Sequence, residues 1–147
     1  DNFNREDGPA CIFWYENGQK KEEIYYIDDK KHREDGPAYQ SWFENGQKEL
    51  EYYYINDKLH RKNGPAFIEW YKNGQKLKEE YLINGIIHRE DGPAFKRWHD
   101  NGQVMSESYH INGYEYDRKD WLEKLKEMNS PHYKEQKMLY DMEIYNL

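Results

Sequence analysis

The sequence predicts a mostly β fold: an elongated array of antiparallel β-hairpins in four units of ~28 residues, capped by two C-terminal helices. The first observation is a motif, His-Arg-Glu-Asp-Gly-Pro-Ala in its fullest form, that recurs every 28 residues. The second is a tryptophan followed by Asn-Gly in each unit. The third is a change to helical spacing after Tyr116. We expect residues 1–113 to form the array and residues 114–147 the helical cap.

The motif copies begin at Asn4, His32, His60 and His88, and the third copy reads His-Arg-Lys-Asn-Gly-Pro-Ala. Units that repeat in phase bury their faces against their neighbours, so each unit contributes to one continuous scaffold. Such an array favours a binding or structural role over a single catalytic pocket.

Two turn signals divide each unit into strands. Asn17-Gly18 and its repeats are typical of a two-residue hairpin loop of type I′, which needs a positive φ at both central residues. A second turn dipeptide closes each unit, as Asp28-Asp29 in the first and Asn84-Gly85 in the third. We expect two strands per unit, with Gly-Pro bending the longer strand because proline donates no ladder hydrogen bond.

A two-residue loop at Asn17-Gly18 would place Trp14 opposite Lys21 and Ile12 opposite Glu23. Side chains alternate between the faces of a sheet, and the residues that repeat unchanged then share one face. Around the second turn, Ile83 would pair with Ile86, which brings the repeated histidines to the same face. We expect this face to be packed and structural. Its ladder residues are Trp14, Trp42, Trp70, Trp98, Tyr25, Tyr53, Tyr81, Tyr109, His32, His60 and His88.

The opposite face varies between units, and its apolar character fades toward the C-terminal half. In the N-terminal units its aromatic residues would form a contiguous patch if no other layer covers them. Large exposed apolar patches mark partner sites, and tyrosine is enriched there. The alternative is that another layer buries this face. The expected partner-binding residues are Phe13, Tyr15, Tyr26, Tyr39, Phe43, Tyr52 and Tyr54.

Helical signals begin at Asp117, a suitable N-cap for a helix over residues 118–128. Ser130 and Pro131 fit the N-cap and first position of a second helix that runs to about Tyr145. The last unit of an array needs a cover for its exposed edge. We expect the two helices to form that cover, with a separate docking element as the alternative.

The composition limits the classes of partner. The net charge of −7 argues against nonspecific binding of nucleic acid, which needs lysine and arginine to displace counterions. It also argues against docking on an anionic membrane. Aromatic residues make up 17% of the chain at fixed repeat positions, which favours order over disorder. We therefore expect a protein partner and neither a nucleic acid nor a membrane.

Cys11 is the single cysteine, which excludes an internal disulfide and a cysteine-rich zinc site. A reducing compartment fits, and we expect the protein to be cytoplasmic. No apolar run approaches the roughly 20 residues that cross a bilayer, and no secretory signal is visible. Because the chain opens inside a repeat without an initiator methionine, we expect that upstream sequence has been removed.

Repeated histidines raise the question of a metal site. His32, His60 and His88 would lie on alternate strands, about 9.5–10 Å apart, whereas a shared zinc needs each nitrogen about 2 Å from the ion. We expect each imidazole to hydrogen-bond a neighbouring strand or turn instead. A ladder of identical glutamates gives no distinct acid and base, so we expect nearby lysine or arginine to neutralise it. These glutamates are Glu23, Glu51, Glu79 and Glu107. The sequence predicts no metal, no cofactor and no enzyme.

The segment 84–94, Asn-Gly-Ile-Ile-His-Arg-Glu-Asp-Gly-Pro-Ala, resembles the variant form of the MORN repeat. The resemblance covers residues 4–113 in four in-phase copies. Such repeats are common in large DNA viruses, phages and bacteria, and some bacterial relatives are described as antitoxins. The resemblance implies an elongated antiparallel hairpin array used for protein contacts, with no catalytic residues.

Three functional interpretations follow. We expect a non-enzymatic scaffold or assembly module that binds another protein through the variable aromatic face, with a viral origin as one option. The second interpretation is an inhibitor, such as an antitoxin, an immunity protein or a phage counter-defence factor, whose acidic surface blocks a basic enzyme. The third is a carbohydrate-binding surface, because aromatic ladders also stack on sugars.

Overall fold

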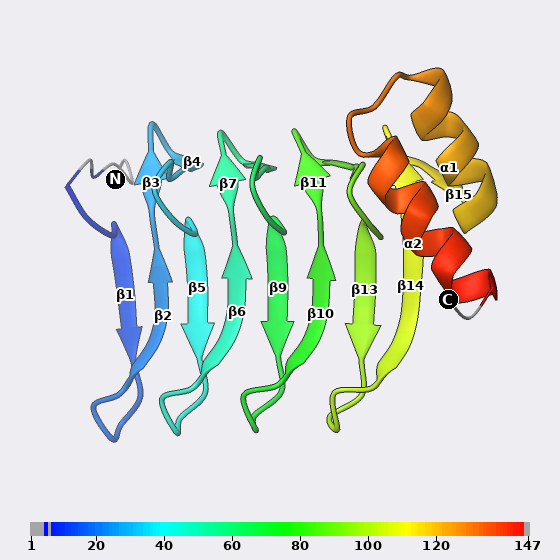
Figure 1. Cartoon of the computed structure of the whole chain (residues 1–147). Coiled ribbons are helices and arrows are strands. Elements are labelled where there is room, and N and C mark those ends of the chain that lie inside the picture. The colour runs from blue at the N-terminus through cyan, green and yellow to red at the C-terminus, as the bar shows by residue number, and fades with distance from the viewer. Residues whose placement is uncertain (1–4, 6, 146–147) are drawn as a thin grey trace.

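The computed structural model describes residue 5 and residues 7–145, and its main feature is a nine-stranded antiparallel sheet (Figure 1). The strands lie side by side in sequence order, with two helices after the last strand. Its strands are β1 (Cys11–Trp14), β2 (Lys20–Ile24), β5 (Tyr39–Trp42), β6 (Lys48–Tyr52), β9 (Phe67–Trp70), β10 (Lys76–Glu80), β13 (Phe95–Trp98), β14 (Val104–Ile111) and β15 (Tyr114–Tyr116). The predicted fold class is confirmed. Residues Asn4 and Glu6 of the first motif copy, and residues 146–147 of the expected cap, lie outside the described residues.

Three short side hairpins interrupt the expected two-strand units. They are β3 (Tyr26–Ile27) with β4 (Lys30–Lys31), β7 (Tyr54–Ile55) with β8 (Lys58–Leu59), and β11 (Leu82–Ile83) with β12 (Ile86–Ile87). The break comes where Tyr53 changes partners: its N–H donates to the Ala66 carbonyl at 2.8 Å, and its carbonyl accepts from the His60 N–H at 2.9 Å. The prediction of two strands per unit is therefore wrong for the first three units, which have four.

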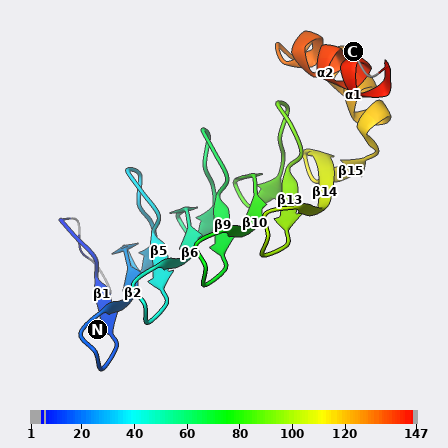
Figure 2. The same cartoon turned by 60° about the horizontal axis from the view of Figure 1, so that its bottom comes forward.

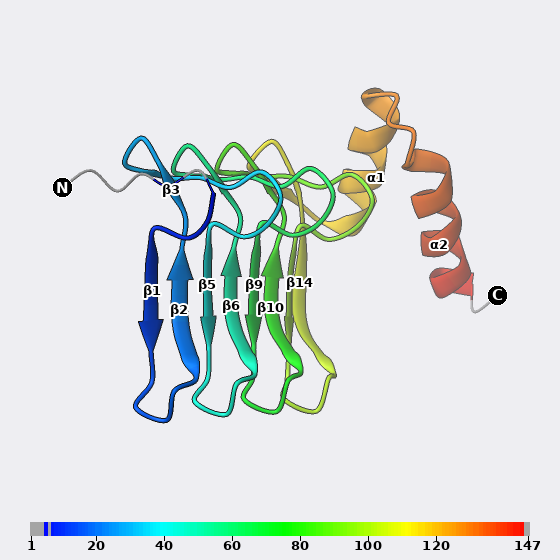
Figure 3. The same cartoon turned by 90° about the vertical axis from the view of Figure 1, so that its left-hand side faces the viewer.

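The side hairpins gather at one end of the long strands (Figure 3). Seen obliquely, the sheet is a single layer, with no described segment forming a second layer of strands or helices over β1 to β10 (Figure 2). Neither face of the N-terminal array is therefore covered by a second layer of the described chain.

The two kinds of turn differ from the prediction. Gly18 has a φ of 82°, but Asn17 is not in the positive-φ region, and Gly18 donates to the Tyr15 carbonyl at 3.0 Å. This is a type I turn followed by a left-handed glycine, the three-residue hairpin loop. The predicted type I′ geometry occurs instead at the second turn, where Asn84 and Gly85 have φ values of 53° and 80°.

The longer loop also shifts one pair in the register. Ile12 lies opposite Glu23, as predicted, but Trp14 lies opposite Lys20 and not Lys21 because a bulge follows Phe13. An extra residue in one strand of an antiparallel pair produces this kind of shift. In the third side hairpin, Ile83 pairs with Ile86, and that prediction is confirmed.

The repeated tryptophans share one face, but they are not buried. Trp14 is 59% exposed, and Trp42, Trp70 and Trp98 are partly exposed. The Nζ atom of Lys48 lies 4.8 Å from the centroid of the Trp42 ring, a cation–π contact at the surface. The expectation that the tryptophans form a packed row is wrong for Trp14. A single-layer sheet has no second layer to cover its ring.

The motif arginines hold the loops that join successive hairpins. The guanidinium of Arg33 stacks on the Tyr25 ring at 4.0 Å, donates from Nε to Asp35 at 2.8 Å, and donates from Nη1 to the Pro37 carbonyl at 3.5 Å. A Cβ atom on Gly36 would come within 2.9 Å of the Arg33 Cζ atom, so a larger residue there would displace the arginine side chain. The same stacking occurs for Arg61 over Tyr53 at 3.8 Å and for Arg89 over Tyr81 at 3.7 Å.

The motif histidines join one side hairpin to the next. The Asn84 backbone N–H donates to His60 Nδ1 at 3.2 Å, and that nitrogen lies 2.8 Å from Asn84 Oδ1. His32 contacts Asn56 in the same way, 24 residues later in the chain. Each ring therefore contacts a neighbouring turn, as expected, and no metal-sized cluster of histidines forms among residues 5 and 7–145.

Replacing His60 by alanine should lower the free energy of unfolding by about 1–3 kcal/mol, because the Asn84 N–H loses its acceptor. Urea unfolding followed by circular dichroism measures this effect. His99→Ala is the matched control, since His99 is exposed in the fourth turn. Equal unfolding midpoints for the two variants would contradict the assigned role.

The helices α1 (Arg118–Glu127) and α2 (Tyr133–Tyr145) pack at the C-terminal end of the array (Figure 1). Asp117 accepts from the Asp120 N–H at 2.8 Å and so caps α1. Trp121 and Leu125 of α1 are fully buried against Ile111, forming the hydrophobic core of this end. Neither described helix has the length and apolar character needed to cross a membrane. The strand β15 continues the sheet past residue 113, the expected boundary between array and cap.

Candidate functional site

Three of the expected partner-binding residues form one aromatic cluster, which we call the tyrosine cluster: Tyr39, Tyr52 and Tyr54. The Tyr39 and Tyr52 rings meet edge to face at 5.5 Å, and Tyr54 stacks on Tyr52 at 5.9 Å. Cross-strand pairing of Tyr39 with Tyr52 brings the first contact about. The three rings are partly buried and line a shallow groove of about 250 Å³.

The other four expected residues lie on strands β1 and β3 and in two hairpin turns. Phe13 is 50% exposed on the same face near the first edge of the sheet. Tyr15 lies in a turn and donates its hydroxyl to the Trp42 carbonyl at 2.9 Å, which holds it to the neighbouring hairpin. Phe43 lies in the following turn, and Tyr26 lies in β3. Of the seven expected residues, the structure therefore brings Tyr39, Tyr52 and Tyr54 together in one cluster.

Two residues that contact the tyrosine cluster were not among the expected partner-binding residues. The Phe67 ring lies 4.8 Å from the Tyr52 ring across the sheet, and is 6% exposed. The Lys31 ammonium lies 5.3 Å from the Tyr54 ring and 6.0 Å from the Tyr39 ring. Lys31 lies at the end of β4, directly before the motif copy that begins at His32, whereas Leu59 and Ile87 occupy the equivalent positions of the next two units. The sequence therefore gives no repeated signal for this lysine.

The rings are chemically inert in the physiological range. Burial is the main cause that raises the pKa of the Tyr39, Tyr52 and Tyr54 phenols above the usual value of 10.0. The cluster therefore stays neutral near pH 7 and offers apolar ring surface, phenol hydrogen bonds and one cation from Lys31. These groups suit the binding of a partner and supply no nucleophile.

The opposite face carries the repeated glutamates, and each has a lysine partner. The pairs are Lys20–Glu23 at 2.7 Å, Lys48–Glu51 at 2.9 Å, Lys76–Glu79 at 2.8 Å and Lys96–Glu107 at 3.3 Å. Tyr25 also donates its hydroxyl to Glu23 at 2.8 Å. The predicted neutralisation by lysine is thus observed, by a lysine three residues earlier in the first three units and by the cross-strand Lys96 in the fourth.

Residue Glu23 is 6% exposed, and the pKa of its carboxyl group lies below the usual value of 4.5. Burial by itself raises this pKa, but hydrogen bonds from Lys20 and Tyr25 and the nearby positive charges outweigh it. A lowered pKa in the folded state means that the carboxylate stabilises the fold above its unfolded pKa. That contribution is lost as the pH falls through the folded pKa.

Glu23→Gln should therefore lower the free energy of unfolding by about 1 kcal/mol at pH 7, and the difference from wild type should shrink toward pH 3. Thermal melts between pH 3 and 7 measure it. Glu16→Gln, at an exposed turn position, should leave the pH profile unchanged. A gap between Glu23→Gln and wild type that widens on acidification would contradict the assigned ion pair.

Comparison with known families matches two stretches of the array. The family model described as the MORN repeat variant matches residues 10–28 and 94–112. These are the same stretch of the first and fourth units, from the motif alanine to the first residue of the type I′ turn. No curated protein and no solved structure matches the chain. The resemblance that the motif predicted is confirmed, because the first and fourth units match the MORN repeat variant. This match is consistent with a repeat protein involved in protein interactions.

Proposed function

We propose that this chain is a non-enzymatic repeat protein, a scaffold or assembly module, that binds another protein through the aromatic face of its N-terminal units. The observation that carries the proposal is the tyrosine cluster on an open face of a single-layer sheet. Aromatic rings supply large contact area at a low cost in side-chain entropy, which makes them frequent binding hot spots.

The position of the cluster supports a partner-facing role. Register places Phe95 and Ser108 of the fourth unit where Tyr39 and Tyr52 stand in the second. The apolar surface is therefore concentrated in one part of the array, and the structural features of the units are shared throughout. Variation confined to one face of otherwise equal units is the arrangement that repeat proteins use for recognition.

The Lys31 ammonium gives this surface a positive charge that can orient a bound partner. It lies over two of the three rings, so a carboxylate of the partner could reach it at the edge of the cluster. We propose a partner surface with an apolar centre and an acidic residue at its rim. Such rim charges set orientation and association rate more than affinity.

The double variant Tyr39→Ala/Tyr54→Ala should weaken partner binding by at least about tenfold without unfolding the array. The partner is first captured from the native host with the wild-type chain, purified, and then titrated by calorimetry. Phe95→Ala/His110→Ala is the matched control, because these residues occupy the equivalent positions in the fourth unit. Equal affinities for the two double variants would contradict the proposal.

A further inference from the structure

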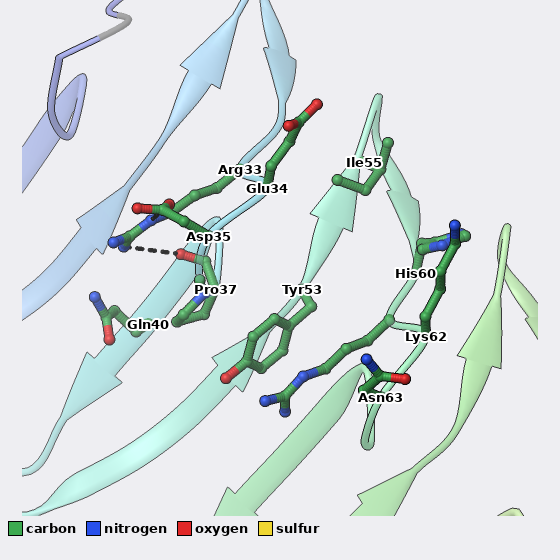
Figure 4. Close-up of a pocket in the computed structure, with 12 residues that line it drawn as sticks. Arg33, Glu34, Asp35, Pro37, Gln40, Tyr53, Ile55, His60, Lys62 and Asn63 are labelled. Carbon is green, nitrogen blue, oxygen red and sulfur yellow. Dashed lines mark hydrogen bonds and ion pairs between the residues drawn. The ribbon is translucent and has the colours of Figure 1, made fainter.

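The motif loops, residues 32–37, 60–65 and 88–93, enclose a series of grooves on the face opposite the tyrosine cluster. The groove between the first two of these loops, which we call the middle groove, has a volume of about 730 Å³. Its walls include Arg33, Asp35 and Lys62, with Tyr53 and Ile55 between them (Figure 4). A similar groove of about 570 Å³ follows between the next two loops. Both lie within the ~300–1,000 Å³ range of ligand sites.

The equivalent position after the last motif loop is filled by the chain itself. Trp121 of α1 lies 4.8 Å from the Tyr109 ring and donates its indole N–H to the Arg89 carbonyl at 3.3 Å. Tyr109 and Ile111 are 8% and 2% exposed there, whereas their counterparts Tyr53 and Ile55 are only partly buried. The same wall residues thus bind a tryptophan-bearing helix at one end of the array.

Polar contacts fix the orientation of this internal occupant. The Ser130 hydroxyl donates to Glu90 at 2.6 Å, and the Gln136 amide donates to the Asp91 carbonyl at 3.1 Å. The middle groove offers the same acceptors, since Glu34 and Asp35 occupy the positions of Glu90 and Asp91. The groove that follows has Lys62 at this position, and a lysine cannot accept a hydrogen bond.

From this equivalence we propose that the middle groove binds a helix-turn-helix segment of a partner protein, with a tryptophan on its first helix and hydroxyl or amide donors in the turn and second helix that follow. The indole lies against Tyr53 and Ile55 and donates to the Arg33 carbonyl. The donors reach Glu34 and the Asp35 carbonyl. Among the described residues, no side chain donates to the Arg33 carbonyl, so that acceptor is available to the indole. This surface is independent of the tyrosine cluster.

The test uses the full chain and a fluorescent peptide copying residues 117–136, with a staple in its first helix, residues 118–127. Fluorescence anisotropy should show saturable binding that weakens by about tenfold or more when the peptide carries Trp121→Ala or the chain carries Ile55→Lys. Ile83→Lys, at the equivalent position of the following groove, should leave binding within about threefold of wild type.

A second variant distinguishes a loss of binding from a loss of folding. Glu34→Lys changes an exposed side chain and gives the middle groove the lysine found in the following one, so it should also weaken binding by about tenfold. Absence of saturable binding, or equal effects of Ile55→Lys and Ile83→Lys, would overturn the proposal. Self-association of the chain that requires Trp121, without peptide binding, would overturn it in favour of a second copy as the occupant.

Discussion

Trp121→Ala should lower the free energy of unfolding of the C-terminal end by about 3–5 kcal/mol, the largest effect expected for a single substitution in this chain. The indole is fully buried, lies against Tyr109, and donates to the Arg89 carbonyl. Its removal leaves a cavity between α1 and β14 and an unpaired carbonyl. Because contacts in a repeat array are mostly between neighbours, the loss should appear first as release of the helices.

Urea unfolding followed by the helical circular dichroism signal measures the release of α1 and α2. Trp14→Ala is the control of the same residue type. Trp14 is 59% exposed, so its replacement should change stability by no more than about 0.5 kcal/mol. Equal losses for the two variants would contradict the assignment of Trp121 as the centre of the helical cap.

Ala66→Leu should destabilise the middle of the array by about 1–3 kcal/mol, because it places a larger side chain at a fully buried position. Ala66 has no exposed surface, and its backbone is hydrogen-bonded to Glu80 on one side and Tyr53 on the other, both at 2.8 Å. The register places its Cβ between Tyr53 and Tyr81, whose rings carry the stacked arginines.

The measurement is the urea midpoint of the array, with Ile68→Leu as the control. Ile68 is 7% exposed, and a volume-conserving replacement there should cost less than about 1.5 kcal/mol. A leucine at position 66 that leaves the midpoint unchanged would show that the motif alanine is not selected by packing.

The strand pattern could be predicted from the sequence because period-two alternation and turn dipeptides are local signals. They placed Ile12 opposite Glu23 and Ile83 opposite Ile86 correctly. The turn type at Asn17-Gly18 could not be predicted, since Asn-Gly fits both a type I′ loop and a type I turn with a left-handed glycine. The exposure of the tryptophans depends on the absence of a covering layer, which is a property of the whole fold.

For the candidate site, alternation along β5 and β6 predicted that Tyr39 and Tyr52 share a face. It did not predict the contribution of Lys31, because this lysine lies on a side hairpin that begins where the Tyr25 carbonyl accepts from the His32 N–H. The middle groove was also missed, since its walls come from motif loops that the sequence indicated only as turns.

The most direct test of the account is hydrogen–deuterium exchange of the full chain with and without its captured protein partner. We expect slower exchange in the peptides that cover residues 39–54, where the tyrosine cluster lies, and unchanged exchange over residues 95–110, the equivalent stretch of the fourth unit. Slower exchange over residues 95–110 with no change over residues 39–54 would contradict recognition by the N-terminal aromatic face.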